Sequence, residues 1–331
     1  MEDRQQAKQV VLDYFADLEA AAPNDIAAVL ERHVTDDYCL RAVHPFNVID
    51  SAADVAESVW APLATSFTSL QRRQDIFMAG PNLIAGDMWV TSMGTFLGLF
   101  DKPWLGIRPT RKIALLPYCE FHRIADGRIT ESARWVDVVS IMKQSGYTPF
   151  GPQTGAEIVN PGPRTADGML LEAQDEAESQ KTLDLIMQMC SELVGDGMES
   201  PDDNLRNTWH EDMLWFGPSG IGATFTIERY QKQHQGPFNA GLKNIEFNGH
   251  ILEHAEGSYG GWFGWPNLRM QQGEGFLGLP ASDKRAEMRV VDIYRRDGDK
   301  LAENWIFIDF LHYQKLLDLD VLQRYAELNP E

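Results

Sequence analysis

Residues 121–131 read Phe121-His-Arg-Ile-Ala-Asp-Gly-Arg-Ile-Thr-Glu131, and Asp137 follows six residues after the last of them. The same arrangement returns later in the chain. Residues 293–303 read Ile293-Tyr-Arg-Arg-Asp-Gly-Asp-Lys-Leu-Ala-Glu303, and Asp309 again follows six residues later. In the first copy, Asp126-Gly127 is a favoured two-residue turn between antiparallel strands. The sequence therefore predicts the same β-hairpin twice.

A second pair of segments supports an internal repeat. Thr95-Phe-Leu-Gly-Leu99 recurs as Gly275-Phe-Leu-Gly-Leu279, and Pro62 and Pro237 each stand near the end of an expected helix. A period of roughly 150 residues is too long for a solenoid and indicates two similar domains. The length of 331 residues fits this interpretation, because each half is long enough to bury its own core.

Each half places its helical patterns first and its strand patterns after them, which is typical of an α+β domain. The expected hairpin strands cover 112–123 and 128–140 in the first half, and 286–296 and 300–312 in the second. Between the halves, four prolines and four glycines within 147–174 indicate an irregular connector. We therefore predict a first domain over 1–146, a connector over 147–174 and a second domain over 175–331.

The composition narrows the class of protein. With 29 basic and 49 acidic side chains, the formal charge of −20 argues against binding nucleic acid or an anionic membrane surface. No apolar run approaches the roughly 20 residues that a membrane span needs, and the polar start shows no signal peptide. Only three cysteines occur, far apart, which makes a disulfide framework unexpected. We expect a soluble cytoplasmic protein whose partner is a small-molecule substrate.

The first hairpin carries the candidate catalytic residues. If Asp126-Gly127 is a simple two-residue turn, four cross-strand pairs share one face of the sheet. These pairs are His122 with Glu131, Glu120 with Ala133, Tyr118 with Trp135, and Leu116 with Asp137. Carboxyl, imidazole and aromatic groups on one half-buried face suit acid–base chemistry, because burial raises the pKa of a carboxyl toward neutrality. The alternative is that this face is the solvated side of the sheet.

The same reasoning applied to the second hairpin gives a more apolar face. Its expected pairs are Tyr294 with Glu303, Asp292 with Trp305, Val290 with Phe307, and Met288 with Asp309. The candidate pocket residues of this half are therefore Asp292, Tyr294, Trp305 and Asp309. For both Asp137 and Asp309 a second interpretation stays open, in which the carboxylate caps a backbone group or pairs with an arginine.

Several segments resemble the SnoaL-like polyketide (ester) cyclases. Gly127-Arg-Ile-Thr-Glu-Ser-Ala-Arg-Trp-Val-Asp137 and Met142-Lys-Gln-Ser-Gly146 are similar to the closing strand and tail of that family. His44-Pro45 and Trp60-Ala-Pro-Leu are similar to its earlier segments. The resemblance covers most of 5–146 and, more weakly, 178–325. It implies two nuclear transport factor 2-like domains, each a curved, mainly antiparallel sheet packed with N-terminal helices around a cone-shaped pocket.

What the resemblance implies for function is cofactor-free acid–base chemistry on a carbonyl compound. Asp137 occupies the place of the proton-transferring aspartate, which Glu120 and His122 would assist, while Tyr118 and Trp135 would shape the pocket. Because such sheets often associate through their outer faces, a homodimer is also expected.

Three further residues are candidates for substrate binding. His44 is placed at the pocket mouth, with a structural histidine as the alternative. Arg73 is placed for binding an anion, with a surface pair to Asp75 as the alternative. Trp60 is either a ligand platform or part of the core.

A metal site is not expected. His250-Ile-Leu-Glu-His254 matches an inverted zinc-protease pattern, which requires a helix to bring both histidines to one metal. Here the repeat places the segment on a strand, where these histidines lie about 13 Å apart.

These observations favour a lyase or isomerase that acts on a small carbonyl metabolite. Two alternatives remain at this point. One is a hydrolase that activates water with the same carboxylate, and the other is a non-catalytic module that binds a small molecule.

Overall fold

The computed structural model describes residues 3–195 and 204–329. The chain divides into two compact units. Unit 1 comprises Met1–Tyr147, Arg164–Ala173 and Asp320–Glu331, and unit 2 comprises Thr148–Pro163 and Gln174–Leu319. Each unit has a six-stranded mixed sheet preceded in the chain by helices, so the predicted α+β class is confirmed.

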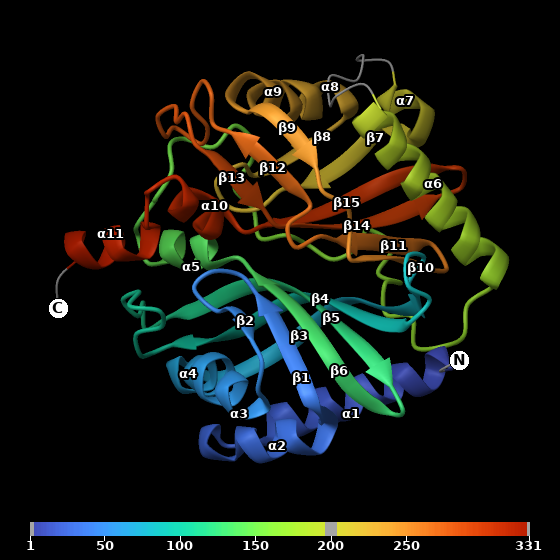
Figure 1. Cartoon of the computed structure of the whole chain (residues 1–331), viewed down its shortest axis with the longest axis vertical. Helices are drawn as coiled ribbons and strands as arrows, with labels where there is room; N and C mark the ends of the chain where they lie inside the picture. The colour runs from blue at the N-terminus through green and yellow to red at the C-terminus, as the bar shows by residue number, and fades with distance from the viewer. Residues whose placement is uncertain (1–2, 196–203, 330–331) are drawn as a thin grey trace. The chain divides into compact units, whose positions relative to one another are not determined.

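The helices between Arg4 and Ser66 cover one face of the sheet of unit 1 (Figure 1). The first, α1 (Arg4–Ala20), begins at Asp3, whose carboxylate accepts the backbone N–H of Gln5. It turns Val11, Tyr14 and Phe15 into the core. The helical segments that follow are η1 (Pro23–Asp25), α2 (Ile26–His33), α3 (Ala52–Val55), η2 (Ala56–Trp60) and α4 (Ala61–Ser66).

The strands of unit 1 form one sheet in the order β2-β1-β6-β5-β4-β3. Only the β1–β6 pair is parallel among the pairs of this sheet that the structure describes. The bounds are β1 (Val34–Ala42), β2 (Asn47–Ile49), β3 (Phe67–Pro81), β4 (Met88–Phe100), β5 (Ile113–Ala125) and β6 (Arg128–Val136). Two helices complete the unit, α5 (Val138–Gln144) and α11 (Val321–Leu328).

Unit 2 repeats this plan with a second six-stranded sheet in the order β10-β11-β14-β15-β7-β8. Its helical segments are α6 (Glu176–Gly195), α7 (Leu205–Thr208), α8 (Ile227–Tyr230), η3 (Gln231–Gln235), α9 (Gly236–Gly241) and α10 (Phe310–Leu316). The strands of the large sheet are β7 (Trp209–Phe216), β8 (Ala223–Phe225), β10 (Leu252–Glu256), β11 (Tyr259–Phe263), β14 (Val290–Asp297) and β15 (Lys300–Ile308).

Three strands that are continuous in unit 1 are divided in unit 2. Their outer parts form a separate sheet in the order β13-β12-β9, with β9 (Lys243–Phe247), β12 (Leu268–Gln271) and β13 (Arg285–Met288). Between β11 and β12, Pro266 has no N–H to give to a ladder. There the Asn267 side chain replaces the ladder, because its Oδ1 accepts the backbone N–H of Val290 at 2.9 Å.

Within residues 3–195 and 204–329, no helix is both long enough and apolar enough to span a membrane.

Candidate functional site

The first hairpin contains a β-bulge that changes which side chains share a face. Next to the turn, Ala125 lies opposite Arg128 and Ile124 opposite Ile129, as predicted. The register then shifts between Ile124 and Arg123. A shift of one residue exchanges the two faces of a strand, because side chains alternate.

The predicted pairs beyond the bulge are therefore wrong. The observed pairs are Arg123 with Glu131, His122 with Ser132, Glu120 with Arg134, and Tyr118 with Val136. Tyr118, Glu120 and His122 thus share a face with Arg134, whereas Glu131, Ala133 and Trp135 lie on the opposite face.

In the interior of unit 1, Glu120 lies between two arginines. Its Oε2 accepts a hydrogen bond from Nη1 of Arg72 at 2.6 Å. Its Oε1 forms an ion pair with Nε of Arg134 at 2.8 Å. All three side chains are buried, at 4%, 1% and 2% exposure for Arg72, Glu120 and Arg134. Burial opposes ionisation of Glu120, but the two guanidiniums outweigh it and hold its pKa below the ordinary value.

The neighbouring polar groups are neutral near pH 7. Burial lowers the pKa of His122 to about 4, and its Nδ1 lies 2.9 Å from Oγ of Ser132. Burial also raises the pKa of Tyr118 to about 12, and its hydroxyl lies 3.1 Å from Oγ of Ser92. Glu120 and His122 are thus brought together as predicted, but neither group is poised to exchange a proton at neutral pH.

Asp137 lies at the beginning of a helix. Strand β6 ends at Val136, short of the predicted 140, and Oδ1 of Asp137 accepts the backbone N–H of Ser140 at 2.8 Å. This is an N-cap, which satisfies one of the free donors of the first turn of α5. The capping interpretation left open above therefore describes this carboxylate.

Among the remaining candidates of unit 1, Trp60 packs against Arg134, whereas Trp135 lies on the opposite face of the sheet. Trp135 is buried against Phe121, with ring centroids 6.2 Å apart. His44 is buried and Arg73 is exposed. Trp60 lines a cavity of about 240 Å³.

Unit 2 encloses a larger cavity of about 350 Å³. Helical segments α6, η3 and α9 and strands of both sheets contribute to it. Most of the lining is apolar or aromatic, and the polar residues are fewer. The lining includes Phe238, Phe247, His250, Glu253, Trp262, Met288, Val290, Asp292, Tyr294 and Ile306.

The hairpin of unit 2 has its bulge at the corresponding place, between Arg295 and Arg296. The predicted pairs of this hairpin are therefore wrong for the same reason. The observed pairs are Arg295 with Glu303, Tyr294 with Asn304, Asp292 with Ile306, and Val290 with Ile308. Because Asp292–Arg295 precedes its bulge as Glu120–Arg123 precedes the first, Asp292 occupies the place of Glu120.

Asp292 is a buried carboxyl group on the wall of this cavity. It is 5% exposed, and its Oδ1 accepts a hydrogen bond from Nδ2 of Asn304 at 2.9 Å. Burial raises the pKa of Asp292 to about 8, although hydrogen bonds from Asn304 and Tyr294 favour the ionised form. At neutral pH the carboxyl is therefore mostly protonated and can act as a proton donor.

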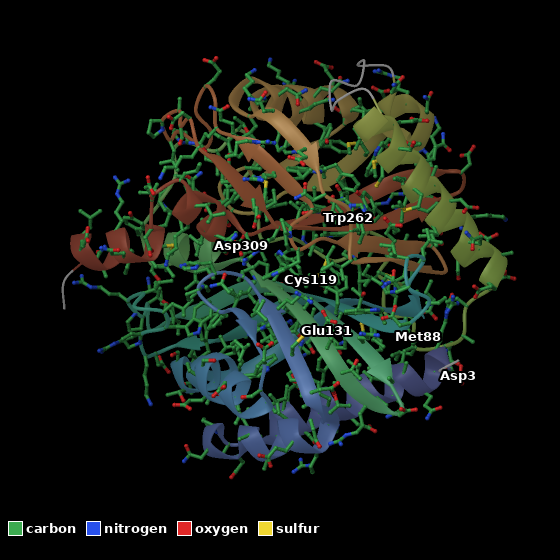
Figure 2. The ribbon with its side chains drawn as sticks, viewed as in Figure 1. Asp3, Met88, Cys119, Glu131, Trp262 and Asp309 are labelled. Atoms are coloured by element: carbon green, nitrogen blue, oxygen red, sulfur yellow. The ribbon has the colours of Figure 1, made fainter. Side chains whose placement is uncertain are left out.

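A histidine and a glutamate lie on the wall of the same cavity. Nδ1 of His250 is 2.8 Å from Oε1 of Glu253, and the imidazole stacks on Trp262 with centroids 4.2 Å apart. Trp262, labelled in Figure 2, lies opposite Asp292 in the β11–β14 ladder. Since Glu253 occupies Nδ1, Nε2 of His250 is the nitrogen left to exchange a proton with a ligand.

Asp309 and Trp305 do not line this cavity. Asp309, labelled in Figure 2, begins α10, where its Oδ1 accepts the N–H of His312 at 3.1 Å. Its Oδ2 pairs with Nη1 of Arg289 at 3.2 Å. Trp305 is buried, and its Nε1 donates to the carbonyl oxygen of Pro161 at 2.9 Å. Both alternatives that were left open for Asp309, capping and pairing with an arginine, are thus realised.

The structure also identifies residues that sequence reasoning did not select. Arg72 and Arg134 were not selected. In the predicted register Arg134 stands between Ala133 and Trp135 and therefore lies on the face opposite Glu120, because no residue marks the bulge. His250 and Glu253 were recognised only as part of a metal pattern. Within 3–195 and 204–329, no group of three or more His, Cys, Asp or Glu side chains is placed to hold a metal ion.

No protein-family model and no curated protein matches the chain. Solved structures do match it. One is a protein from Jannaschia sp. CCS1 named "putative SnoaL-like polyketide cyclase", with 20% identity over 43% of this chain and 96% of that one, at a TM-score of 0.34. Another is AclR from Streptomyces galilaeus, named "putative hydroxylase". The match has 19% identity, covers 44% of this chain and 98% of AclR, and has a TM-score of 0.36.

A third is a nuclear transport factor 2-like (NTF2-like) protein from Burkholderia xenovorans LB400. The match has 13% identity, covers 42% of this chain and 97% of that one, and has a TM-score of 0.33. The matches thus include the family and superfamily that the sequence resembles. At these identities and TM-scores they carry no information about chemistry.

Proposed function

We propose that the cavity of unit 2 is the active site of a cofactor-free lyase or isomerase that acts on a small, mostly apolar carbonyl compound. The observation that carries this proposal is Asp292, a carboxyl group with a pKa of about 8 on the wall of a largely apolar cavity. A group that titrates near the working pH can both give and take back a proton, which general acid–base catalysis requires.

In the proposed reaction, Asp292 and His250 act on opposite ends of an enolisable group. His250, oriented through Nδ1 by Glu253, takes the proton from the carbon next to the carbonyl. The electron pair of that C–H bond forms the C=C bond, and the carbonyl π pair takes the proton of Asp292. An enol results. Where a second C=C bond is conjugated with the enol, His250 can return its proton to the far carbon of that system, and Asp292 takes back the enol O–H proton, which gives an isomer. Where a leaving group stands on the β-carbon, its loss and the return of the O–H proton to Asp292 give an elimination product.

The apolar lining supports the proposal in two ways. Side chains such as Phe238, Met288 and Ile306 offer contact to a hydrocarbon body but no hydrogen bonds. Their exclusion of water also strengthens the hydrogen bond from Asp292 to a carbonyl oxygen, because the local dielectric is low.

The test is exchange of α-hydrogens in D₂O, which reports proton abstraction without knowledge of the natural substrate. Propiophenone and 2-cyclohexenone serve as probes, and deuterium uptake is followed by mass spectrometry. We expect Asp292→Asn to slow exchange by about 10²- to 10⁴-fold. We also expect wild-type exchange to fall as the pH rises through the pKa of Asp292 at about 8.

The matched control is Asp297→Asn, the same change at an exposed position of β14, which should leave exchange unchanged. Wild-type exchange in Asp292→Asn would refute the proposal. Saturable probe binding without exchange in the wild type would instead identify a non-catalytic binding module. Incorporation of solvent ¹⁸O into a new hydroxyl or carboxyl product would identify a hydrolase.

A further inference from the structure

The interior of unit 1 carries more positive than negative charge. Arg72 and Arg134 are guanidiniums, and Glu120 is the carboxylate that lies between them. His122 does not add a charge, because burial lowers its pKa to about 4. Among the buried groups that the structure describes here, two cations and one anion leave a net positive charge. A buried charge without a counter-charge is costly, so this arrangement favours an additional anion.

Arg134 also has hydrogen-bond donors that the protein does not use. Its Nη1 and Nη2 are buried, and neither has an acceptor among the residues that the structure describes. A guanidinium offers its donors as a planar fork that suits the two oxygens of a carboxylate.

The cavity of about 240 Å³ in unit 1 is lined by the side chain of Arg72, whereas Arg134 lies behind the cavity wall. Arg72, Trp60 and Phe96 all line it. The Arg134 guanidinium lies 4.2 Å from the ring centre of Trp60 and 5.3 Å from that of Phe96. The Arg72 guanidinium lies 5.6 Å and 4.7 Å from the same two centres. Both cations therefore pack against two aromatic rings of the cavity wall.

The rest of the cavity wall is mostly apolar. It is formed by Leu18, Ala21, Pro23, Ile26, Ala64, Phe67 and Leu70, with Ser69 and Glu19 as polar members. Glu19 is exposed, and its Oε1 accepts the backbone N–H of Arg72 at 2.7 Å. Because solvent screens an exposed carboxylate, Glu19 offsets little of the buried positive charge.

We infer that unit 1 is a binding site for a small apolar carboxylate. The hydrocarbon part lies against the apolar wall, and the carboxylate faces the Arg72 side chain that lines the cavity, while Arg134, behind Trp60 and Phe96, adds its positive charge. This site is separate from the cavity proposed for catalysis in unit 2, and neither proposal depends on the other.

Hexanoate is the probe, and its binding is measured by calorimetry, with hexanamide as the neutral analogue of the same shape. We expect hexanoate to bind the wild-type chain and hexanamide to bind at least about tenfold more weakly, because the amide lacks the charge. Arg134→Met should weaken hexanoate binding by about 10- to 100-fold. Arg111→Met, which removes an exposed arginine of unit 1 that does not line the cavity, should leave binding unchanged.

A second variant separates loss of the site from loss of the fold. Ala64→Phe fills the cavity and keeps both buried arginines. It should abolish hexanoate binding, and its melting temperature should stay close to that of the wild type, which shows that the fold is intact. Three results would each overturn the inference. They are equal binding of hexanamide and hexanoate, unchanged hexanoate binding in Arg134→Met, and calorimetric binding of chloride or phosphate as tight as that of hexanoate. No hexanoate binding to the wild type would do the same.

Discussion

The two units place a carboxyl group at the same position of the same bulged hairpin and surround it differently. In unit 1, Glu120 lies opposite Arg134 in the ladder. In unit 2, Asp292 lies opposite Ile306. The row four residues before each carboxyl ends at Arg72 in unit 1 and at Phe247 in unit 2. Two arginines are thus exchanged for two apolar side chains.

This exchange reverses the behaviour of the carboxyl. Paired with arginines, Glu120 has a lowered pKa and stays ionised, and its salt bridges occupy the interior. Among apolar side chains, Asp292 has a pKa raised to about 8 and lines an open cavity of about 350 Å³. One scaffold therefore yields an ion-paired interior in one unit and a titratable carboxyl in the other, and the neighbours decide which.

The largest effect is expected when an arginine is placed beside Asp292 in unit 2, because this gives Asp292 the surroundings of Glu120. In Ile306→Arg, a guanidinium would lie opposite Asp292 as Arg134 lies opposite Glu120. The pKa of Asp292 should fall, the carboxyl should be ionised at pH 7, and the proton donor should be lost. We expect α-hydrogen exchange of propiophenone to slow by at least about 100-fold.

Ile306→Met is the control for this variant, because it keeps an apolar side chain of similar size and should exchange within a few-fold of the wild type. If Ile306→Arg folds and exchanges at the wild-type rate, the surroundings of Asp292 do not control its chemistry.

The next effect is on stability, and its sign should differ between the two carboxyls. The folded pKa of Asp292, about 8, lies above the unfolded value of about 3.9. Between these values the folded state binds more protons, so stability falls as the pH rises. Asp292→Asn removes this pH-dependent loss of stability. At pH 8 the free energy of unfolding of the variant should exceed that of the wild type by about a few kcal/mol, and the difference should shrink toward pH 4.

Glu120 should show the opposite. Its lowered folded pKa stabilises the fold above the unfolded pKa, and this stabilisation is lost as the pH falls through the folded value. Glu120→Gln at pH 7 leaves two guanidiniums without a counter-charge and should cost about 3–5 kcal/mol. Denaturant unfolding of both variants from pH 4 to pH 8.5 measures the two signs. Variants that shift stability in the same direction would contradict the comparison.

The hairpins show how far the sequence could predict this arrangement. The turn at Asp126-Gly127 and the two pairs beside it were predicted correctly, because local backbone preferences determine them. The bulge next to Arg123 was not predicted. Neither Arg123 nor Arg295 is a residue type that marks a bulge, and a bulge is a feature of strand pairing that local residue preferences do not specify.

That single error explains most of the misplaced site residues. It moved Arg134 to the outer face and Trp135 to the inner one, and in unit 2 it paired Asp292 with Trp305 in place of Ile306. The repeat and the α+β class did not depend on register, so these predictions survived. The division of the long strands in unit 2 was also missed, although Pro266 is a residue that interrupts a ladder.

The smallest predicted effect concerns the two aspartates that follow the hairpins. Asp137→Ala removes the N-cap of α5 and should cost about 1 kcal/mol in the free energy of unfolding. Asp309→Ala removes a cap and also the partner of Arg289, so it should cost more than Asp137→Ala. Neither change touches the cavity of Asp292, and deuterium exchange should stay within a few-fold of the wild type. A loss of exchange in Asp137→Ala, without a matching loss of stability, would return the catalytic role to unit 1, where the sequence alone had placed it.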